Sequence, residues 1–78
     1  MHHVVALCLD GLVAFDLTAA VQVFIAASEE DGMPLYEVST CSPGGAEVTT
    51  TTGFALRPQA DLDALAGADT IVVPGYFA

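Results

Sequence analysis

The stretch that decides the fold is Val4–Leu9 (VVALCL), six apolar residues in a row without the alternation of a half-exposed strand. A continuous apolar run is typical of a strand covered on both faces, as in parallel sheets. Thr70–Val73 (TIVV), which ends at Pro74-Gly75, has the same character. The two runs therefore predict neighbouring strands in the interior of one parallel sheet.

A long helix is expected between these strands, from about Asp16 to Ser28. Its apolar side chains recur at helical spacing, at Leu17, Val21, Phe24 and Ile25. The acidic stretch 29–31 and Gly32 end the helix, because carboxylates are unfavourable at a helix C-terminus and glycine suits the cap.

The rest of the chain supplies shorter elements. Residues 35–41 alternate loosely as a strand, and the threonine-rich segment 47–56 predicts a small hairpin. Residues 61–67 predict a short second helix, with Asp61 as N-cap and Gly67 just past its end. The order strand, helix, strand, hairpin, helix, strand predicts an α/β fold, a doubly wound, flavodoxin-like three-layer sandwich.

The helices expected here are too few for the sheet. One long and one short helix would leave large apolar faces of a parallel sheet in water. We therefore expect residues 1–78 to be the N-terminal, incomplete part of a larger domain, or else to assemble with other copies.

Charge excludes several functions. The 78 residues carry ten acidic side chains and a single basic one, Arg57, for a net charge of −9. Nucleic-acid binding needs clustered Lys and Arg, so these residues are not expected to contact DNA. No apolar run approaches the roughly 20 residues of a membrane span. Without a signal peptide or a disulfide framework, we expect a cytoplasmic protein with no membrane partner.

Ligands of doubly wound sheets bind beyond the C-terminal ends of the strands. Two loops leave such ends, one around Gly11 and one at Gly75-Tyr76, and Asp16 begins the helix that follows the first of them. Two interpretations of Asp16 stay open: a carboxylate stabilised by the helix dipole, or a group with a chemical role. The Pro74-Gly75 turn likewise either stops a strand or offers backbone N–H groups to a ligand.

Other kinds of site find no support. The first strand is followed by no glycine-rich phosphate loop, so no nucleotide cofactor is expected, nor any other. His2 and His3 are adjacent and point to opposite faces of a strand, and a frayed terminus is the expectation there rather than a metal site. Cys8 is expected to be an inert core residue, whereas Cys41, before a turn, is expected to be more exposed.

The motifs in their order resemble those of the ThiJ/PfpI superfamily, which has the class I glutamine amidotransferase-like fold. The resemblance rests on residues 9–17, leading to Val23-Phe24, and on 53–58, 61–62 and 68–75, and so covers nearly all of the chain. The sequence looks most like the N-terminal domain of AraC-type transcription regulators. Isonitrile hydratases are close relatives that share the Asp-Leu-Thr beginning of the helix, here at residues 16–18.

The resemblance implies roles for a few residues. Asp16 matches an acid that, in catalytic members, hydrogen-bonds a cysteine nucleophile, and that nucleophile would lie beyond Ala78. Gly11, Gly75 and Tyr76 would line the ligand site, with Tyr76 standing where the family has a second glycine. The helix stretch 19–22 also departs from the family pattern. Both departures favour a regulator over an enzyme.

Three functional hypotheses follow. The first is the ligand-sensing, homodimeric module of an AraC-type regulator, whose DNA contacts belong to a separate basic domain. The second is a cysteine-dependent hydratase, hydrolase or deglycase in which Asp16 holds the thiolate. The third is a ThiJ/PfpI-like scaffold without a ligand.

Overall fold

The apolar run that opens the sequence is the central strand of a three-stranded parallel sheet. The computed structural model describes residues 1–27 and 29–76. Strand β1 (His2–Leu7) lies between β2 (Tyr36–Cys41) and β5 (Thr70–Val72). The register aligns His2 with Tyr36 along β2 and Val4 with Thr70 along β5. The expected parallel pairing of the two apolar runs is therefore confirmed.

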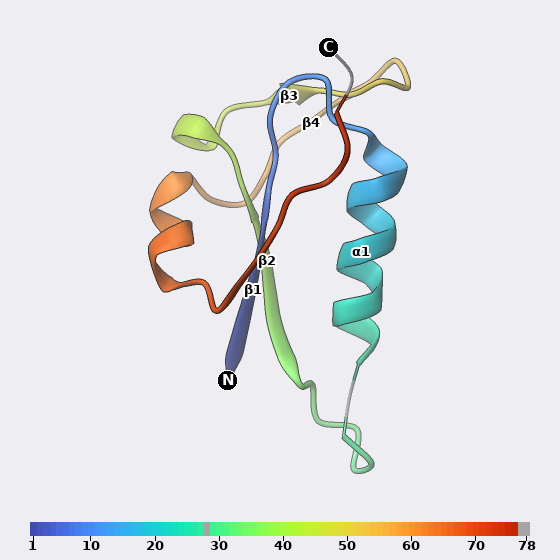
Figure 1. Ribbon diagram of the computed structural model, residues 1–78, viewed down its shortest axis with the longest axis vertical. Coiled ribbons are helices and arrows are strands. Elements are labelled where there is room, and N and C mark those ends of the chain that lie inside the picture. Colours follow the sequence, from blue (N-terminus) through green and yellow to red (C-terminus); the bar gives the residue numbers. More distant parts are fainter. Residues whose placement is uncertain (28, 77–78) are drawn as a thin grey trace.

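Helices cover the two faces of this sheet. Helix α1 (Ala14–Ala26) lies on one face, and the 3-10 helix η2 (Leu62–Gly67) lies on the other (Figure 1). The alternation follows from the strand order β2-β1-β5: the chain crosses from β1 to β2 through α1 and then from β2 back past β1 to β5 through η2. Right-handed crossovers that run in opposite directions along a sheet place their helices on opposite faces. The doubly wound, three-layer α/β fold is confirmed.

The boundaries of α1 differ from the expected ones. The helix begins at Ala14, so Asp16 is its third residue, and it ends at Ala26, before the extended Ala27. The expected end, Ser28, lies outside the described residues. Val13 occupies the N-cap position and provides no side-chain hydrogen bond, so no polar residue marked this beginning in the sequence.

The inner face of α1 is narrower than its apolar pattern predicts. Leu17 is buried, and Val21 and Phe24 are half-buried. The side chain of Ile25 is 55% exposed, so its placement in the core was wrong. The helix is apolar around much of its circumference, and the spacing of apolar residues alone therefore did not define the buried stripe.

The short elements follow the expected order. Strands β3 (Val48–Thr49) and β4 (Ala55–Leu56) form the antiparallel hairpin, and η1 (Pro43–Gly45) is a 3-10 turn before it. Asp61 caps η2 by accepting a hydrogen bond of 2.9 Å from the backbone N–H of Asp63. Gly67 is the last residue of η2 rather than the residue after it, which corrects the expected end of that helix.

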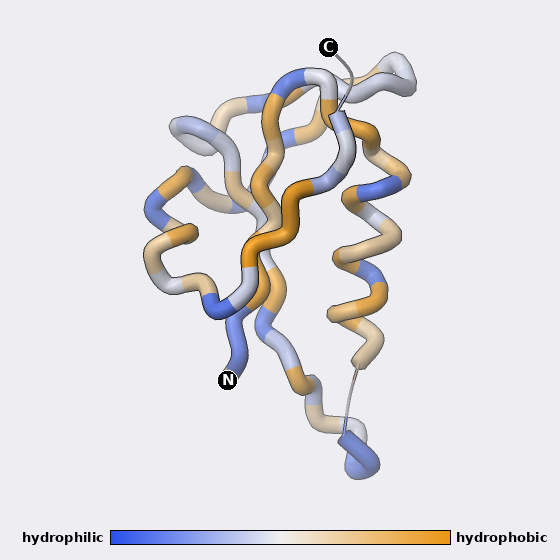
Figure 2. The backbone as a smooth tube through the Cα atoms, viewed as in Figure 1, coloured by the Kyte–Doolittle hydropathy of each residue, from blue (hydrophilic) through white to orange (hydrophobic). Residues whose placement is uncertain are grey.

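The core lies around β1, although the chain trace is also hydrophobic along β5 and parts of α1 (Figure 2). Its buried side chains come from β1, the loop after it, the inner face of α1, and the ends of β2 and β3: Val4, Val5, Ala6, Cys8, Leu12, Ala14, Leu17, Cys41 and Val48. Large apolar side chains also remain exposed, among them Phe15, Ile71 and Val73. The expected surplus of apolar surface is therefore present in the described residues.

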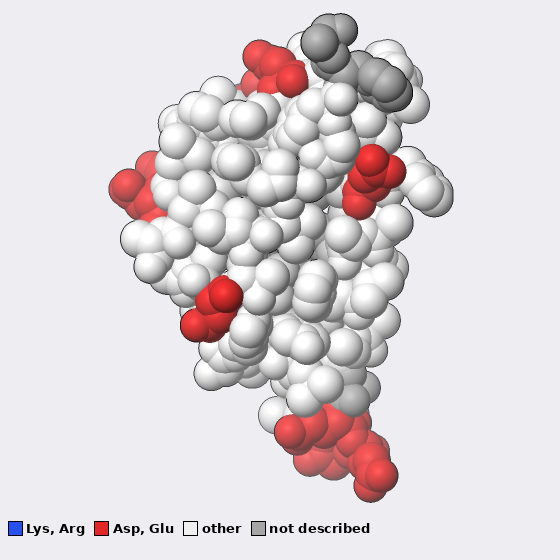
Figure 3. Space-filling model, in the orientation of Figure 1, with Lys and Arg blue, Asp and Glu red and all other residues white. Residues whose placement is uncertain are grey.

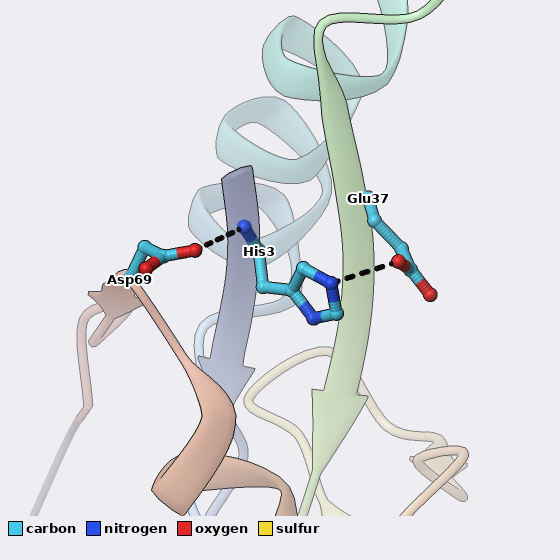
Figure 4. Close-up of polar contacts among 3 residues, drawn as sticks. All are labelled: His3, Glu37 and Asp69. Carbon is cyan, nitrogen blue, oxygen red and sulfur yellow. Dashed lines mark hydrogen bonds and ion pairs between the residues drawn. The ribbon is translucent and has the colours of Figure 1, made fainter. Parts of the chain in front are cut away.

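The N-terminal end of the sheet is tied to its neighbours, which contradicts the expected frayed terminus. The backbone N–H of His3 donates to Asp69 Oδ2 at 2.8 Å, and the N–H of Asp69 donates to the carbonyl of His3 at 2.9 Å. On the other side, His3 Nε2 lies 3.0 Å from Glu37 Oε2 (Figure 4). His2 Nε2 meets Thr70 Oγ1 at 2.7 Å. These contacts hold the first residues in the sheet.

The charge is spread over the surface. The face drawn in Figure 3 shows scattered acidic groups and a denser group over the loop between α1 and β2, which contains residues 29–31. Among the residues that the structure describes, no helix has the length and apolar character needed to cross a membrane.

Candidate functional site

Two loops meet at the C-terminal edge of the sheet, as the strand order predicts. The loop after β1 and the segment after β5 run side by side (Figure 1), and the backbone N–H of Val13 donates to the carbonyl of Gly75 at 2.9 Å. Leu12 and Tyr76 form an isolated antiparallel bridge beside this bond. The loops are 59 or more residues apart in sequence, and the fold makes them adjacent.

Asp16 lies directly against Gly75. A methyl group added at Gly75 would overlap Asp16 Oδ2, and would lie 3.6 Å from Asp16 Cγ and 3.7 Å from Val13 Cγ2. Gly75 does not have a positive φ. A side chain at this position would have to displace the carboxylate of Asp16, which the first turn of α1 places over the Pro-Gly turn.

Backbone donors complete this arrangement. Within the described part of the chain, the N–H groups of Gly75 and Tyr76 donate no hydrogen bond. Asp16 is an exposed acceptor beside these two donors. The cluster can therefore hold a polar group that both donates and accepts, although the described residues enclose no pocket around it.

Gly11 lies on the other side of the same loop. Its φ of 83° is in the left-handed region, which glycine adopts without strain. Its N–H donates to the carbonyl of Thr49 at 3.2 Å and to Thr49 Oγ1 at 3.1 Å. The backbone of Gly11 therefore joins the loop to the hairpin, and its N–H points away from the Asp16–Gly75 contact.

The side chain of Asp10 has a structural role that was not apparent from the sequence. Its Oδ1 accepts a hydrogen bond of 2.9 Å from the backbone N–H of Thr49. Nothing in the sequence links Asp10 to a threonine 39 residues away. Asp10 and Gly11 together fasten β3 to the loop that carries the candidate site.

Tyr76 closes the end of β1. Its hydroxyl donates to the carbonyl of Leu7 at 2.6 Å and accepts from the N–H of Leu9 at 3.2 Å. Burial raises the pKa of Tyr76 above 10.0, against the opposing effect of the hydrogen bond from Leu9. The phenol is therefore neutral at physiological pH. Tyr76 was expected to line the ligand site, and its hydroxyl binds the backbone at the end of β1.

Neither cysteine presents a thiolate at this edge. Cys8 and Cys41 are both fully buried, and burial raises the pKa of each thiol above 9.0. The expected exposure of Cys41 was wrong: Cys41 is fully buried at the end of β2, where it pairs with Leu7 of β1 on one side and forms a bridge with Ala60 on the other. The expectation that Cys8 is a core residue is confirmed. A buried thiol with a raised pKa is a poor nucleophile.

Comparison with known proteins shows which solved structures have a similar fold. No family model and no curated protein matches the sequence. Among solved structures, the chain is similar to a DJ-1 superfamily protein, Atu0886 from Agrobacterium tumefaciens, with a TM-score of 0.68 and 24% identity over 97% of this chain. It is also similar to an AraC family transcriptional regulator from Pseudomonas putida, with a TM-score of 0.73 and 23% identity over 99% of this chain.

The similarity covers part of each larger protein. This chain spans 38% of the DJ-1 superfamily chain and 48% of the AraC family regulator. At these identities the comparisons show the fold. The chain therefore has the α/β fold of ThiJ/PfpI-like proteins, which it shares with a DJ-1 superfamily protein and with an AraC family regulator.

Proposed function

We propose that this chain is the ligand-sensing, dimer-forming part of an AraC-type transcription regulator. The observation that carries the proposal is the similarity to the AraC family regulator over 99% of this chain. With a net charge of −9 and a single arginine, these residues do not bind DNA themselves. DNA is contacted by a separate basic domain of the whole protein.

The edge of the sheet supports a binding role. Asp16 offers an acceptor against Gly75, and the N–H groups of the consecutive residues Gly75 and Tyr76, which donate no hydrogen bond within the described residues, offer two donors. No exposed thiol stands beside them in the described residues, since Cys8 and Cys41 are buried. Such a group of donors and acceptors suits recognition of a small polar ligand.

A cysteine-dependent hydratase or hydrolase is the second candidate. The contact between Asp16 and Gly75 favours it, because an acid beside a turn can orient a nucleophile, and backbone N–H groups that donate no hydrogen bond within the described residues can stabilise an oxyanion. In this candidate the nucleophile comes from beyond residue 78, and Asp16 holds its thiolate and protonates the intermediate.

The test uses the whole natural protein and a random pool of DNA duplexes. We expect the purified protein to enrich a defined sequence, and the Asp16→Asn variant to enrich the same sequence, because another domain contacts the DNA. Asp63→Asn, an exposed acidic residue on η2, is the matched control. Absence of any enriched sequence, together with hydration of an isonitrile that Asp16→Asn abolishes, would establish the enzyme instead.

A further inference from the structure

The hydroxyl of Tyr76 bridges the backbone on both sides of Cys8. It donates to the carbonyl of Leu7, the residue before Cys8, and accepts from the N–H of Leu9, the residue after it. A strand end normally leaves such groups to water or to a ligand. Here one phenol satisfies both, from a residue 67 or more positions further along the chain.

The ring also covers the core below it. Tyr76 is half-buried and packs against the core cluster that contains Cys8, Leu12 and Leu17. Cys8 is fully buried in this arrangement, and its thiol lies near enough to the phenol to influence its ionisation. The phenol therefore fills the place beyond the end of a central strand where doubly wound folds bind their ligands.

We propose that Tyr76 is a displaceable stopper: its side chain closes the candidate site above Cys8, and a ligand enters by moving the phenol and taking over its two hydrogen bonds. This proposal rests on the ligand-binding role proposed above. It places the phenol at an edge where Asp16 offers an acceptor and where, within the described residues, the N–H groups of Gly75 and Tyr76 donate no hydrogen bond.

The two bonds define the chemistry of the ligand. The group that replaces the phenol must donate to the carbonyl of Leu7 and accept from the N–H of Leu9. A neutral hydroxyl or a primary amide does both, whereas a carboxylate has no proton to donate and an ammonium has no lone pair to accept with. The surrounding core is apolar, so an uncharged ligand is favoured.

The reaction rate of the Cys8 thiol tests whether the side chain of Tyr76 closes the site. In the whole protein with Cys41→Ala, and with any thiol outside these residues also replaced, Cys8 is the thiol that remains. We expect Tyr76→Ala to raise the rate of its reaction with a disulfide reagent at least about tenfold, because opening then costs less by some 1.4 kcal/mol or more. Tyr36→Ala removes another half-buried tyrosine, at the opposite end of the sheet, and should leave the rate unchanged.

Tyr76→Phe keeps the ring and removes both hydrogen bonds. We expect a rise of a few-fold, between the parent and Tyr76→Ala. If Cys8 in Tyr76→Ala reacts as fast as it does in the urea-unfolded protein, Tyr76→Ala has unfolded, and the rate measured for Tyr76→Phe then tests the proposal. Unchanged rates in both Tyr76 variants would overturn the proposal.

Phenol then serves as the probe of the vacated space. Added to Tyr76→Ala, phenol should slow the reaction of Cys8 several-fold, whereas benzene, which lacks the hydroxyl, should slow it less. Equal protection by the two compounds would contradict the inferred hydrogen-bonding requirement. Neither assay uses the natural ligand or DNA. A negative result here would therefore contradict the role of Tyr76 without contradicting the proposed regulator. A negative result in the DNA selection would contradict the regulator without contradicting the role of Tyr76.

Discussion

At the scale of single residues, the candidate site depends on the contact between Asp16 and Gly75. The glycine is needed there because a carboxylate oxygen occupies the space of its missing side chain. The obstructing atom is the end of a short side chain that can rotate away, so a methyl group would move Asp16 rather than the backbone. This gives Gly75 a role that depends on the residue at position 16.

A double-mutant cycle tests this dependence. Gly75→Ala should destabilise the protein by about 1 kcal/mol when Asp16 is present, because the added methyl group overcrowds the contact. In an Asp16→Ala background the same change should be neutral, or stabilising by roughly 0.4–1 kcal/mol, because alanine restricts the unfolded chain. Urea unfolding of the four proteins measures the coupling. Equal effects of Gly75→Ala in both backgrounds would show that the carboxylate lies elsewhere.

At the scale of elements, the attachment of β1 to the segment before β5 depends on Asp69. The carboxylate accepts the N–H of His3, and this hydrogen bond, against a small opposing desolvation, holds the pKa of Asp69 below 3.8, with His2 and His3 contributing further. A lowered pKa means that the unfolded chain binds the proton more tightly than the folded protein does. The stability from this group is therefore present above about pH 4 and is lost as pH falls through the folded-state pKa.

Asp69→Asn tests that attachment. We expect lower stability at pH 7 and a weaker dependence of stability on pH between about 2 and 4, because the ionisable group is gone. Asp63→Asn is the control, since the side chain of Asp63 accepts none of the hydrogen bonds among the described residues. Thermal unfolding across this pH range supplies the measurement. If the stability of Asp69→Asn depended on pH as that of the parent protein does, Asp69 would not be the group that stabilises this attachment.

The boundaries of these elements show how much of the fold could be predicted from the sequence. Two continuous apolar runs predicted the parallel pair, and the Gly-containing threonine segment predicted the hairpin. The beginning of α1 was placed two residues late because Val13 offers no capping side chain. The first strand was expected at residues 4–9 and lies at 2–7, because Asp69 and Glu37 hold the polar His3 in the sheet.

At the scale of the whole molecule, the sequence predicted which loops meet but not the contacts that their side chains make. The order β2-β1-β5 places the loops after β1 and β5 together, so the neighbourhood of Asp16, Gly75 and Tyr76 was predictable. The partners of Asp10 and of the Tyr76 hydroxyl were not, because they depend on side-chain directions that no local pattern encodes. The burial of Cys41 likewise depends on a distant segment, at Ala60.

The exposed apolar surface belongs to this scale as well. Ile71 and Val73 lie exposed at and just beyond β5, which forms one edge of the sheet, and Phe15 lies exposed on α1. That these residues are the first part of a larger domain, and that the whole protein is a homodimer, stay predictions. Both would cover such surface, at about 25 cal/mol for each square ångström removed from water.

The strand order brings Asp16 and Gly75 into contact, and the distance between these two residues can be measured in solution. In an isotope-labelled sample of the whole protein, nuclear Overhauser effects between the β-protons of Asp16 and the α-protons of Gly75 report their distance. We predict clear cross-peaks, together with those that pair β1 with β5. A spectrum that shows the β1–β5 pairing but no signal between Asp16 and Gly75 would contradict the account.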